Sequence, residues 1–277
     1  MASTDSPHCT LCDDTGWISS AEADDRSVQQ CECRLEARQR RQVTRACIPR
    51  RYEHCRLSNF EAEYAGAHSS MGGAKLKCEK YVEEYLRLDY GLVFIGLPGV
   101  GKTHLAVAVL SALLDRYSIS GRFVDYRDLL RDIQESYNPV SETSELQVLR
   151  PLLEADVLLL DDLGARRPSP WVFDTVTHLL NDRYNRKRMT LITTNFGDPP
   201  ATASEAGTSR SGAADPNDAR SAQSSRRSWR ATPEGPASLE DRIGPALRSR
   251  LHQMCDVIRI HGKDARKELR NASFGSS

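Results

Sequence analysis

A glycine-rich segment, Gly96-Leu97-Pro98-Gly99-Val100-Gly101-Lys102-Thr103, constrains the fold of this chain more than any other feature. Its spacing is that of a phosphate-binding loop, and it lies between an apolar run and an amphipathic stretch. Glycines let successive backbone N–H groups face one concavity, and the helix that follows turns its positive end toward the same point. Lys102 adds a charge near the β- and γ-phosphates, and Thr103 offers a ligand for Mg²⁺. The segment therefore predicts a strand–loop–helix unit that binds the phosphates of a nucleotide.

Strands and helices alternate along most of the chain. Short apolar runs predict strands at 92–95, 122–124, 157–160, 190–193 and 257–260. Helical spacing of apolar residues predicts helices at 103–117, 128–137, 144–153, 171–184 and 239–251. This alternation is typical of a central parallel sheet flanked by helices. No run approaches the roughly 18 apolar residues of a membrane helix, and residues 1–12 carry no signal-peptide pattern, which favours a cytoplasmic protein.

Polar side chains follow two of the predicted strands. Asp161 and Asp162 come directly after 157–160. An acid there can hold Mg²⁺, and a second acid can polarise an attacking water. We assign the metal to Asp161 together with Thr103, and the role of general base to Asp162, although Asp162 could instead cap a turn. Asn195 follows 190–193 and can reach the γ-phosphate or the attacking water, unless it only closes the turn.

The charges balance, with 38 lysines and arginines against 38 aspartates and glutamates. A polycation is thereby excluded, and any contact with nucleic acid must be local. One basic stretch, 34–51, is helical in pattern up to about Arg45, and it is either a phosphate-contacting or docking helix or a solvated linker. Arginines on or beside the last helix can stabilise phosphoryl charge, also from a neighbouring subunit, or be ordinary surface residues: Arg242, Arg248 and Arg250.

Four cysteines at the N-terminus have the spacing C-x₂-C-x₁₈-C-x-C: Cys9, Cys12, Cys31 and Cys33. Paired thiolates on short turns are the usual way to build a tetrahedral zinc site, and disulfides are not expected in a cytoplasmic protein. The second pair is tighter than C-x-x-C, and His8 could replace one thiolate. The alternative is reduced cysteines in a disordered tail. The polar segment 1–33 could hardly fold without a metal, so we expect zinc.

Together these motifs resemble the AAA+ ATPases of the DnaC/DnaI helicase-loader and IstB transposition-helper group, which are relatives of DnaA. The resemblance covers roughly 47–197 and 238–266. It is carried by five segments in a fixed order: Gly-Lys-Thr-His-Leu-Ala at 101–106, Leu-Leu-Leu-Asp-Asp-Leu-Gly at 158–164, Thr-Thr-Asn at 193–195, Asp-Arg-Ile-Gly at 241–244 and Leu-Arg-Ser-Arg-Leu at 247–251.

The resemblance implies roles for several residues. Asn195 matches the main polar group of sensor 1. Arg250 occupies the arginine-finger position, with Arg248 as the second choice. His104 belongs to the Lys-Thr-His-Leu signature beside the nucleotide, where helix packing is its expected role. The implied fold is a P-loop NTPase of the AAA+ type without a helical lid domain.

The resemblance also implies an ATPase that uses ATP and Mg²⁺, assembles as a homo-oligomer and acts with a replicative DNA helicase on single-stranded DNA. The alternatives are a transposition helper that acts with a transposase, and an adaptor that binds ATP with little turnover. The expected boundaries are a zinc-knuckle module at 1–33, an arginine-rich connector helix at 34–51, the ATPase core at 52–197, a low-complexity, disordered insert at 198–237, the continued core at 238–266 and a tail at 267–277.

Overall fold

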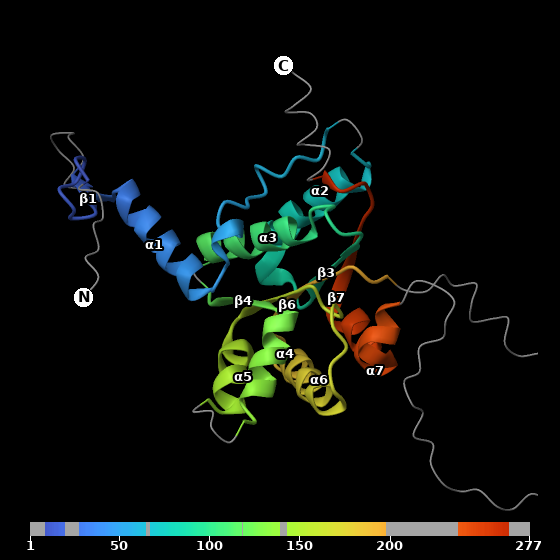
Figure 1. Cartoon of the computed structure of the whole chain (residues 1–277). Coiled ribbons are helices and arrows are strands. Elements are labelled where there is room, and N and C mark those ends of the chain that lie inside the picture. The colour runs from blue at the N-terminus through green and yellow to red at the C-terminus, as the bar shows by residue number, and fades with distance from the viewer. Residues whose placement is uncertain are drawn as a thin grey trace, which may run out of the picture.

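The structure is a computed structural model of the chain, and it describes residues 9–19, 28–64, 67–117, 119–138, 143–197 and 238–265 (Figure 1). The expected insert at 198–237 and tail at 267–277 lie outside the described residues, as does His8.

Five parallel strands form the central sheet, in the order β4-β5-β6-β3-β7. They are β3 (Gly91–Gly96), β4 (Gly121–Asp125), β5 (Val157–Asp161), β6 (Met189–Thr194) and β7 (Cys255–Ile260). Every strand predicted from an apolar run is present, and β7 begins two residues earlier than predicted. The sheet confirms the predicted α/β class, because all neighbouring strands run parallel and helices connect them.

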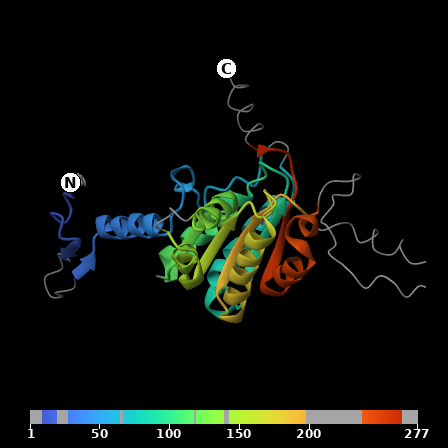
Figure 2. The ribbon, with the colours of Figure 1, turned by 60° about the horizontal axis from the view of Figure 1, so that its bottom comes forward.

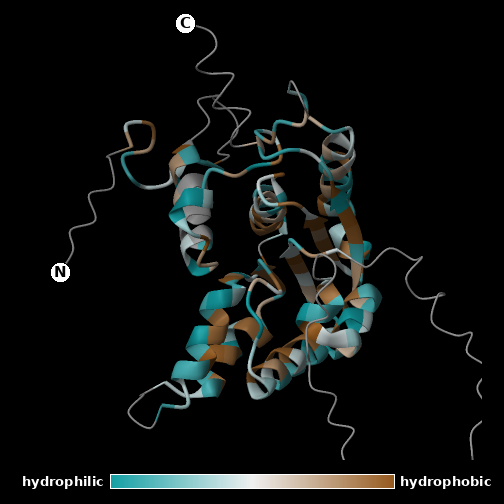
Figure 3. Cartoon of the chain, turned by 45° about the vertical axis from the view of Figure 1, so that its right-hand side comes forward, coloured by the Kyte–Doolittle hydropathy of each residue, from teal (hydrophilic) through white to brown (hydrophobic). Residues whose placement is uncertain are grey.

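Helices cover both faces of the sheet (Figure 2). On one face lie α2 (Ser70–Glu84) and α3 (Lys102–Tyr117), and on the other lie α4 (Tyr126–Glu135), α5 (Glu145–Glu154), α6 (Pro170–Asn185) and α7 (Leu239–Met254). Alternate strand residues serve the two faces: Leu92 packs with α2 and α3, whereas Val93 packs with the other four helices. Because both faces are buried, the strands read as continuous apolar runs, and Figure 3 shows hydrophobic colour concentrated there.

Helix α7 is kinked where the sequence predicted one straight helix. Gly244 has φ 76° and ψ 160°, and Pro245 follows it. The proline has no N–H to donate to the preceding turn, and glycine tolerates the left-handed conformation that the bend needs. Ser238 starts the helix by accepting the N–H of Asp241 at 3.2 Å. The bend divides Arg242 from the half of the helix that carries Arg248 and Arg250.

The N-terminal part is a small module on a projecting helix (Figure 1). Strands β1 (Trp17–Ser19) and β2 (Val28–Gln30) pair antiparallel, and α1 (Glu32–Arg45) connects them to the core. The far end of α1 is fastened to the core, because Gln42 Nε2 donates to the Leu114 carbonyl at 3.1 Å and Phe123 N donates to the Ala46 carbonyl at 2.7 Å.

Two short 3₁₀ helices complete the described elements, η1 (Arg50–Tyr52) after α1 and η2 (Tyr85–Arg87) after α2. Within the described ranges, the longest helices are too short or too polar to cross a bilayer.

Candidate functional site

The phosphate-binding loop follows β3 at the carboxyl edge of the sheet and leads directly into α3. Gly99 and Gly101 have φ of 86° and 95°, which side-chain-bearing residues rarely adopt. At Gly101 a Cβ would also lie 2.6 Å from the ring of Phe60. Both positions therefore need glycine for the backbone turn, and Gly101 needs it also for the close approach of the segment that precedes α2.

A hydrogen-bond network joins three of the predicted site residues. Lys102 Nζ donates to Asn195 Oδ1 at 2.7 Å and to the Leu97 carbonyl at 2.9 Å. Asn195 Nδ2 in turn donates to Asp162 Oδ1 at 3.2 Å. Asn195 thus connects the loop lysine with the acid that follows β5. A phosphate group that binds Lys102 would replace contacts with neutral oxygens by contacts with charged ones, so that both donor and acceptor would be ionised.

A second cluster surrounds Asp161, which is almost fully buried at the end of β5. Its Oδ1 accepts from Thr103 Oγ1 at 2.9 Å and from Thr193 Oγ1 at 2.6 Å. Burial raises the pKa of Asp161 above its usual range, the two hydroxyl bonds oppose that shift, and the nearby Asp162 adds to it. A divalent cation would offset both the burial and the like charge. Thr103 and Asp161 together therefore fit a Mg²⁺ site.

Asp162 has an unusual backbone conformation, with φ of 57°. Its N–H donates to Thr193 Oγ1 at 2.9 Å, and its half-buried carboxylate faces Asn195. A left-handed aspartate is strained by an amount that surrounding contacts must offset, and such residues concentrate at functional sites. The contacts with Thr193 and Asn195 hold Asp162 beside the phosphate loop.

His104 faces the segment before α2. Its Nε2 lies 3.2 Å from the Arg56 carbonyl and 3.0 Å from Asn59 Oδ1, and its ring meets Phe60 edge-on at 5.4 Å. Burial lowers the pKa of His104, the Arg56 carbonyl opposes the shift, and His54 adds to it. A neutral imidazole in these contacts fastens α3 to residues 56–60.

The two candidate finger arginines make different contacts. Arg250 Nε donates to Asn181 Oδ1 at 3.0 Å, and its guanidinium lies 4.4 Å from the ring centre of Tyr184. Both partners belong to α6. Arg248 is instead paired with Glu240 of its own helix at 2.9 Å. Arg250 is therefore held against α6 on the α6–α7 surface.

The structure thus brings together Lys102, Thr103, Asp161, Asp162 and Asn195 at one edge of the sheet, while Arg250 lies on another surface. Sequence reasoning missed the direct contact of Thr193 with Asp161. The signal was present, because a polar residue stands where a buried strand ends. It also missed the burial of Arg183, whose side chain bonds to groups at the amino ends of β5 and β6, the edge of the sheet opposite the site.

The four N-terminal cysteines form one cluster, and their sulfur atoms all lie within 4.8 Å of one another. The Sγ atoms of Cys9 and Cys31 are 3.7 Å apart, and those of Cys12 and Cys33 are 3.3 Å apart. A tetrahedral zinc with bonds of about 2.3 Å sets the sulfur spacing at about 3.8 Å. The donor set and its size therefore fit Zn²⁺.

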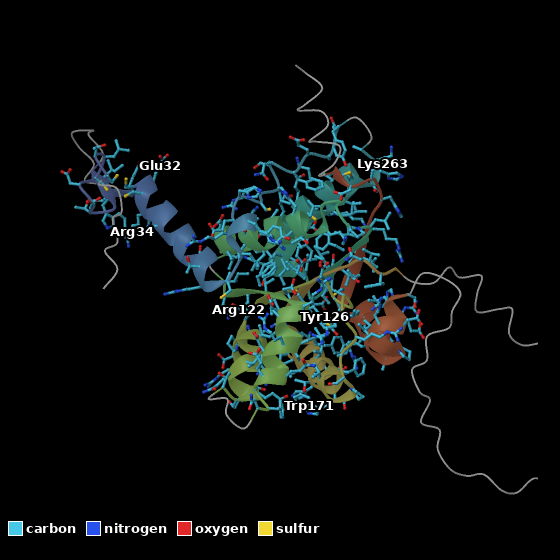
Figure 4. The ribbon with its side chains drawn as sticks, in the orientation of Figure 1. Glu32, Arg34, Arg122, Tyr126, Trp171 and Lys263 are labelled. Carbon is cyan, nitrogen blue, oxygen red and sulfur yellow. The ribbon has the colours of Figure 1, made fainter. Side chains whose placement is uncertain are left out.

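Supporting contacts surround this cluster. Gly16 N donates to Cys12 Sγ at 3.3 Å. Burial alone would raise the pKa of Cys12, but hydrogen bonds from Cys33 and Gly16 lower it to about 7. The tight second pair lies at a helix start and not on a turn: Cys31 is the extended residue that precedes α1, and Cys33 is in its first turn. Figure 4 shows Glu32 and Arg34 beside the module, at the end of α1 away from the core.

Zinc content tests this centre directly. We expect about one zinc per full-length chain by mass spectrometry, and Cys12→Ser should lose it. Cys47→Ser is the matched control, because Cys47 is exposed and outside the cluster. A wild-type chain purified without zinc, or equal loss of zinc in both variants, would show that the cluster is not a zinc site.

A phosphate loop, a buried acid and a polar sensor at the carboxyl edge of a parallel sheet define an AAA+ P-loop NTPase. The family model of IstB-like ATP-binding proteins matches residues 7–198, more than half of the chain, so the chain belongs to that family. This confirms the resemblance that the sequence motifs indicate.

Among curated relatives, the replicative helicase loader DnaC of Escherichia coli K12 is 29% identical over 155 residues, or 56% of this chain. DnaC of Buchnera aphidicola subsp. Schizaphis graminum is 27% identical over 156 residues. In both cases the match spans 61% of the relative's own length.

Solved structures agree with this family. The crystal structure of the DnaC helicase loader is 26% identical, with a TM-score of 0.56, and the match covers 76% of this chain and 99% of the other. That of DnaI covers 77% and 95% at 23% identity, with a TM-score of 0.53, and supports the fold alone.

Proposed function

We propose that this chain is a cytoplasmic ATPase of DNA replication that loads a replicative helicase onto single-stranded DNA. The network that joins Lys102, Asn195 and Asp162 carries this proposal, because an ammonium, an amide and a carboxylate that are bonded in series beside the phosphate loop support the roles of phosphate-binding cation, sensor and base. The similarity to DnaC loaders supports helicase loading as the process in which the proposed ATPase acts.

Each residue has a distinct role in this proposal. Lys102 and the loop N–H groups bind the phosphates of ATP, and Thr103 and Asp161 hold Mg²⁺. The cation neutralises phosphate charge when it is bound. Asp162 accepts a proton from the attacking water, and Asn195 holds the Asp162 carboxylate and the Lys102 ammonium in position by its two hydrogen bonds. Replacement of the Lys102–Asn195 contact by a phosphate would let the sensor report that ATP is bound.

Assembly supplies the remaining part of the site. Arg250 is partly exposed and lies on α7, where it contacts α6. An arginine from a neighbouring subunit can stabilise the charge that develops on the γ-phosphate. Turnover would then require a homo-oligomer in which Arg250 of one subunit faces Lys102 of the next. Assembly would consequently depend on ATP.

The N-terminal module is placed to contact a partner. It lies at the far end of α1, and side chains on its surface include the exposed Leu11, Trp17 and Val28. Arg34 stacks on Trp17 at 4.3 Å and thereby orients the module on the helix. In the proposed function this module recruits the helicase.

An exposed aromatic pair supports contact with single-stranded DNA. The rings of Tyr137 and Trp171 meet edge-on with centroids 3.7 Å apart, and both side chains are exposed. Tyr137 is held by a hydrogen bond to Glu145, and Trp171 lies in the first turn of α6 (Figure 4). Bases stack on such rings irrespective of their sequence.

If bases stack on this aromatic pair, removal of one ring should weaken the binding of single-stranded DNA. Trp171→Ala should weaken binding of a fluorescent oligothymidine about 10-fold, because one stacked base contributes about 1–3 kcal/mol. Leu86→Ala is the control, since Leu86 is an exposed apolar residue of η2 and belongs to none of the proposed contacts. Equal affinities of wild type and Trp171→Ala would remove the aromatic pair from the DNA contact.

Copurification separates the leading function from its main alternative. Tagged full-length chain with ATP should retain the replicative helicase of the same cell, and Cys12→Ser should retain less. The family model favours a second candidate, an ATP-dependent transposition helper. Capture of a transposase without the helicase, with preference for duplex DNA, would establish that alternative. Helicase capture without measurable ATP turnover would indicate an ATP-gated adaptor.

A further inference from the structure

The segment after β7 crosses the phosphate loop. We call residues 261–265 the strap. It is fastened at one end to the start of α2, where His261 N donates to Ser70 Oγ at 2.9 Å and the rings of His68 and His261 meet at 5.4 Å. Gly262, with φ of 144°, turns the chain beside His68. The exposed Lys263 follows, near α2 in Figure 4.

The other end of the strap lies on the loop itself. Ala265 N donates to the Gly99 carbonyl at 3.1 Å. The carboxylate of Asp264 packs against the α-carbon of Gly99 so closely that a Cβ there would be 2.1 Å from Asp264 Oδ1. Because Gly99 has no side chain, it allows the turn of the loop and also leaves room for the carboxylate of Asp264.

The position of an acidic side chain against this loop is unexpected on electrostatic grounds. The loop presents N–H groups, the Lys102 ammonium and the start of α3, all of which attract anions. A carboxylate is itself an anion, and that of Asp264 lies against this loop at Gly99. A nucleotide triphosphate in the loop would place several negative charges beside Asp264, which is unfavourable at such short range.

We propose that Asp264 acts as an anionic plug on the phosphate loop, so that ATP must displace the strap before it binds fully. Nucleotide binding is then linked to release of residues 261–265 from the loop. The inference rests on the proposed ATP site and adds a regulation to it. The strap opposes occupancy by highly charged nucleotides, and ADP, with less charge, displaces it less.

Removing the charge tests the plug. Asp264→Asn keeps the size of the side chain, and we expect it to bind ATP about 5-fold more tightly by calorimetry in low salt, the effect of one unit charge near another at an exposed site. The gain should be smaller for ADP and should shrink as salt is added. Asp256→Asn is the control, because Asp256 lies on the same strand–strap segment but faces Lys77.

The ATP affinities of three proteins also distinguish failure of the plug from failure of the proposed ATP site. If wild type binds ATP, Lys102→Ala does not, and Asp264→Asn matches wild type or is weaker, the plug is refuted and the ATP site stands. If wild type binds ATP no better than Lys102→Ala does, the ATP site fails, and the plug fails with it.

Hydrogen exchange gives a readout independent of activity. ATP should speed exchange of the peptide that contains Ala265, whose N–H is bonded to Gly99 in the described structure, while it slows exchange across the phosphate loop. Slower exchange in both peptides would mean that the strap closes over bound nucleotide, which contradicts displacement.

Discussion

Replacing Arg250 by alanine is expected to lower ATP turnover of the assembled protein by about 10³-fold, the effect of losing an arginine finger. ATP affinity should stay within a factor of about two, because each subunit's own phosphate loop is unchanged. In the described structure Arg250 contacts Asn181, Gln253 and Tyr184, none of which belongs to the loop. Steady-state turnover with single-stranded DNA, together with calorimetric affinity, measures both quantities.

Arg248→Ala is the matched control. It lies two residues away and pairs with Glu240 on the protein surface, so we expect a change below about 3-fold. Mixing two kinds of variant subunit provides a stricter test of whether Arg250 acts across subunits. Arg250→Ala subunits keep Lys102, and Lys102→Ala subunits keep Arg250, so mixed assemblies should recover part of the turnover. No recovery on mixing, or a larger loss with Arg248→Ala, would mean that Arg250 is not the residue that acts across subunits.

Replacing Arg183 by methionine is expected to destabilise the core by about 3–5 kcal/mol, the usual effect of breaking a buried charged network. Arg183 is fully buried in α6 and is surrounded by oxygen acceptors. It donates to the carbonyls of Leu152, Ala155, Asp156 and Met189 and to the hydroxyl of Thr190. The Asp156 carbonyl would keep a donor in Met189 N, and each of the other buried acceptors left without one would cost about 1–3 kcal/mol before relaxation.

Thermal unfolding measures this effect, and Tm should fall by about 10 °C. Arg186→Met is the control at the C-cap of α6, where the exposed Arg186 pairs with Asp182 and we expect a change of about 0.5 kcal/mol. If Arg183→Met does not fold, Arg183→Lys should fold with a lower Tm, since lysine keeps the charge but has fewer donors. An unchanged Tm in either variant would show that the carbonyl cluster does not need the guanidinium.

The strands and the phosphate loop could be predicted because their signals are local. A fully buried strand is an apolar run, and the loop needs glycine at fixed positions for backbone reasons. Helix α2 was not predicted: its adjacent Gly72 and Gly73 weaken helix propensity, and the exposed Leu76 obscures the apolar stripe. Packing on α3 stabilises α2, and packing cannot be read from a local pattern.

Long-range contacts explain why the burial of Arg183 and the position of Asp264 could not be predicted from the sequence. Arg183 stands in a polar stretch that reads as a surface helix end, and only the turn before β5 makes it a buried residue. Asp264 meets Gly99 from the far end of the chain, and neither residue alone suggests the contact. Asp161 and Asn195 lie at one edge of the sheet, because the carboxyl ends of parallel strands share an edge, and this proximity follows from the predicted parallel sheet.

ATP hydrolysis by the full-length chain tests the ATP-driven role most directly. With Mg²⁺ and single-stranded DNA present and no other ATPase in the assay, wild type should hydrolyse ATP at least about 100-fold faster than Lys102→Ala, because Lys102 is the cation that binds the phosphates. Asp161→Asn should be as slow as Lys102→Ala. If wild type hydrolyses ATP no faster than Lys102→Ala, the chain is not an ATPase, and ATP hydrolysis cannot drive the loading step.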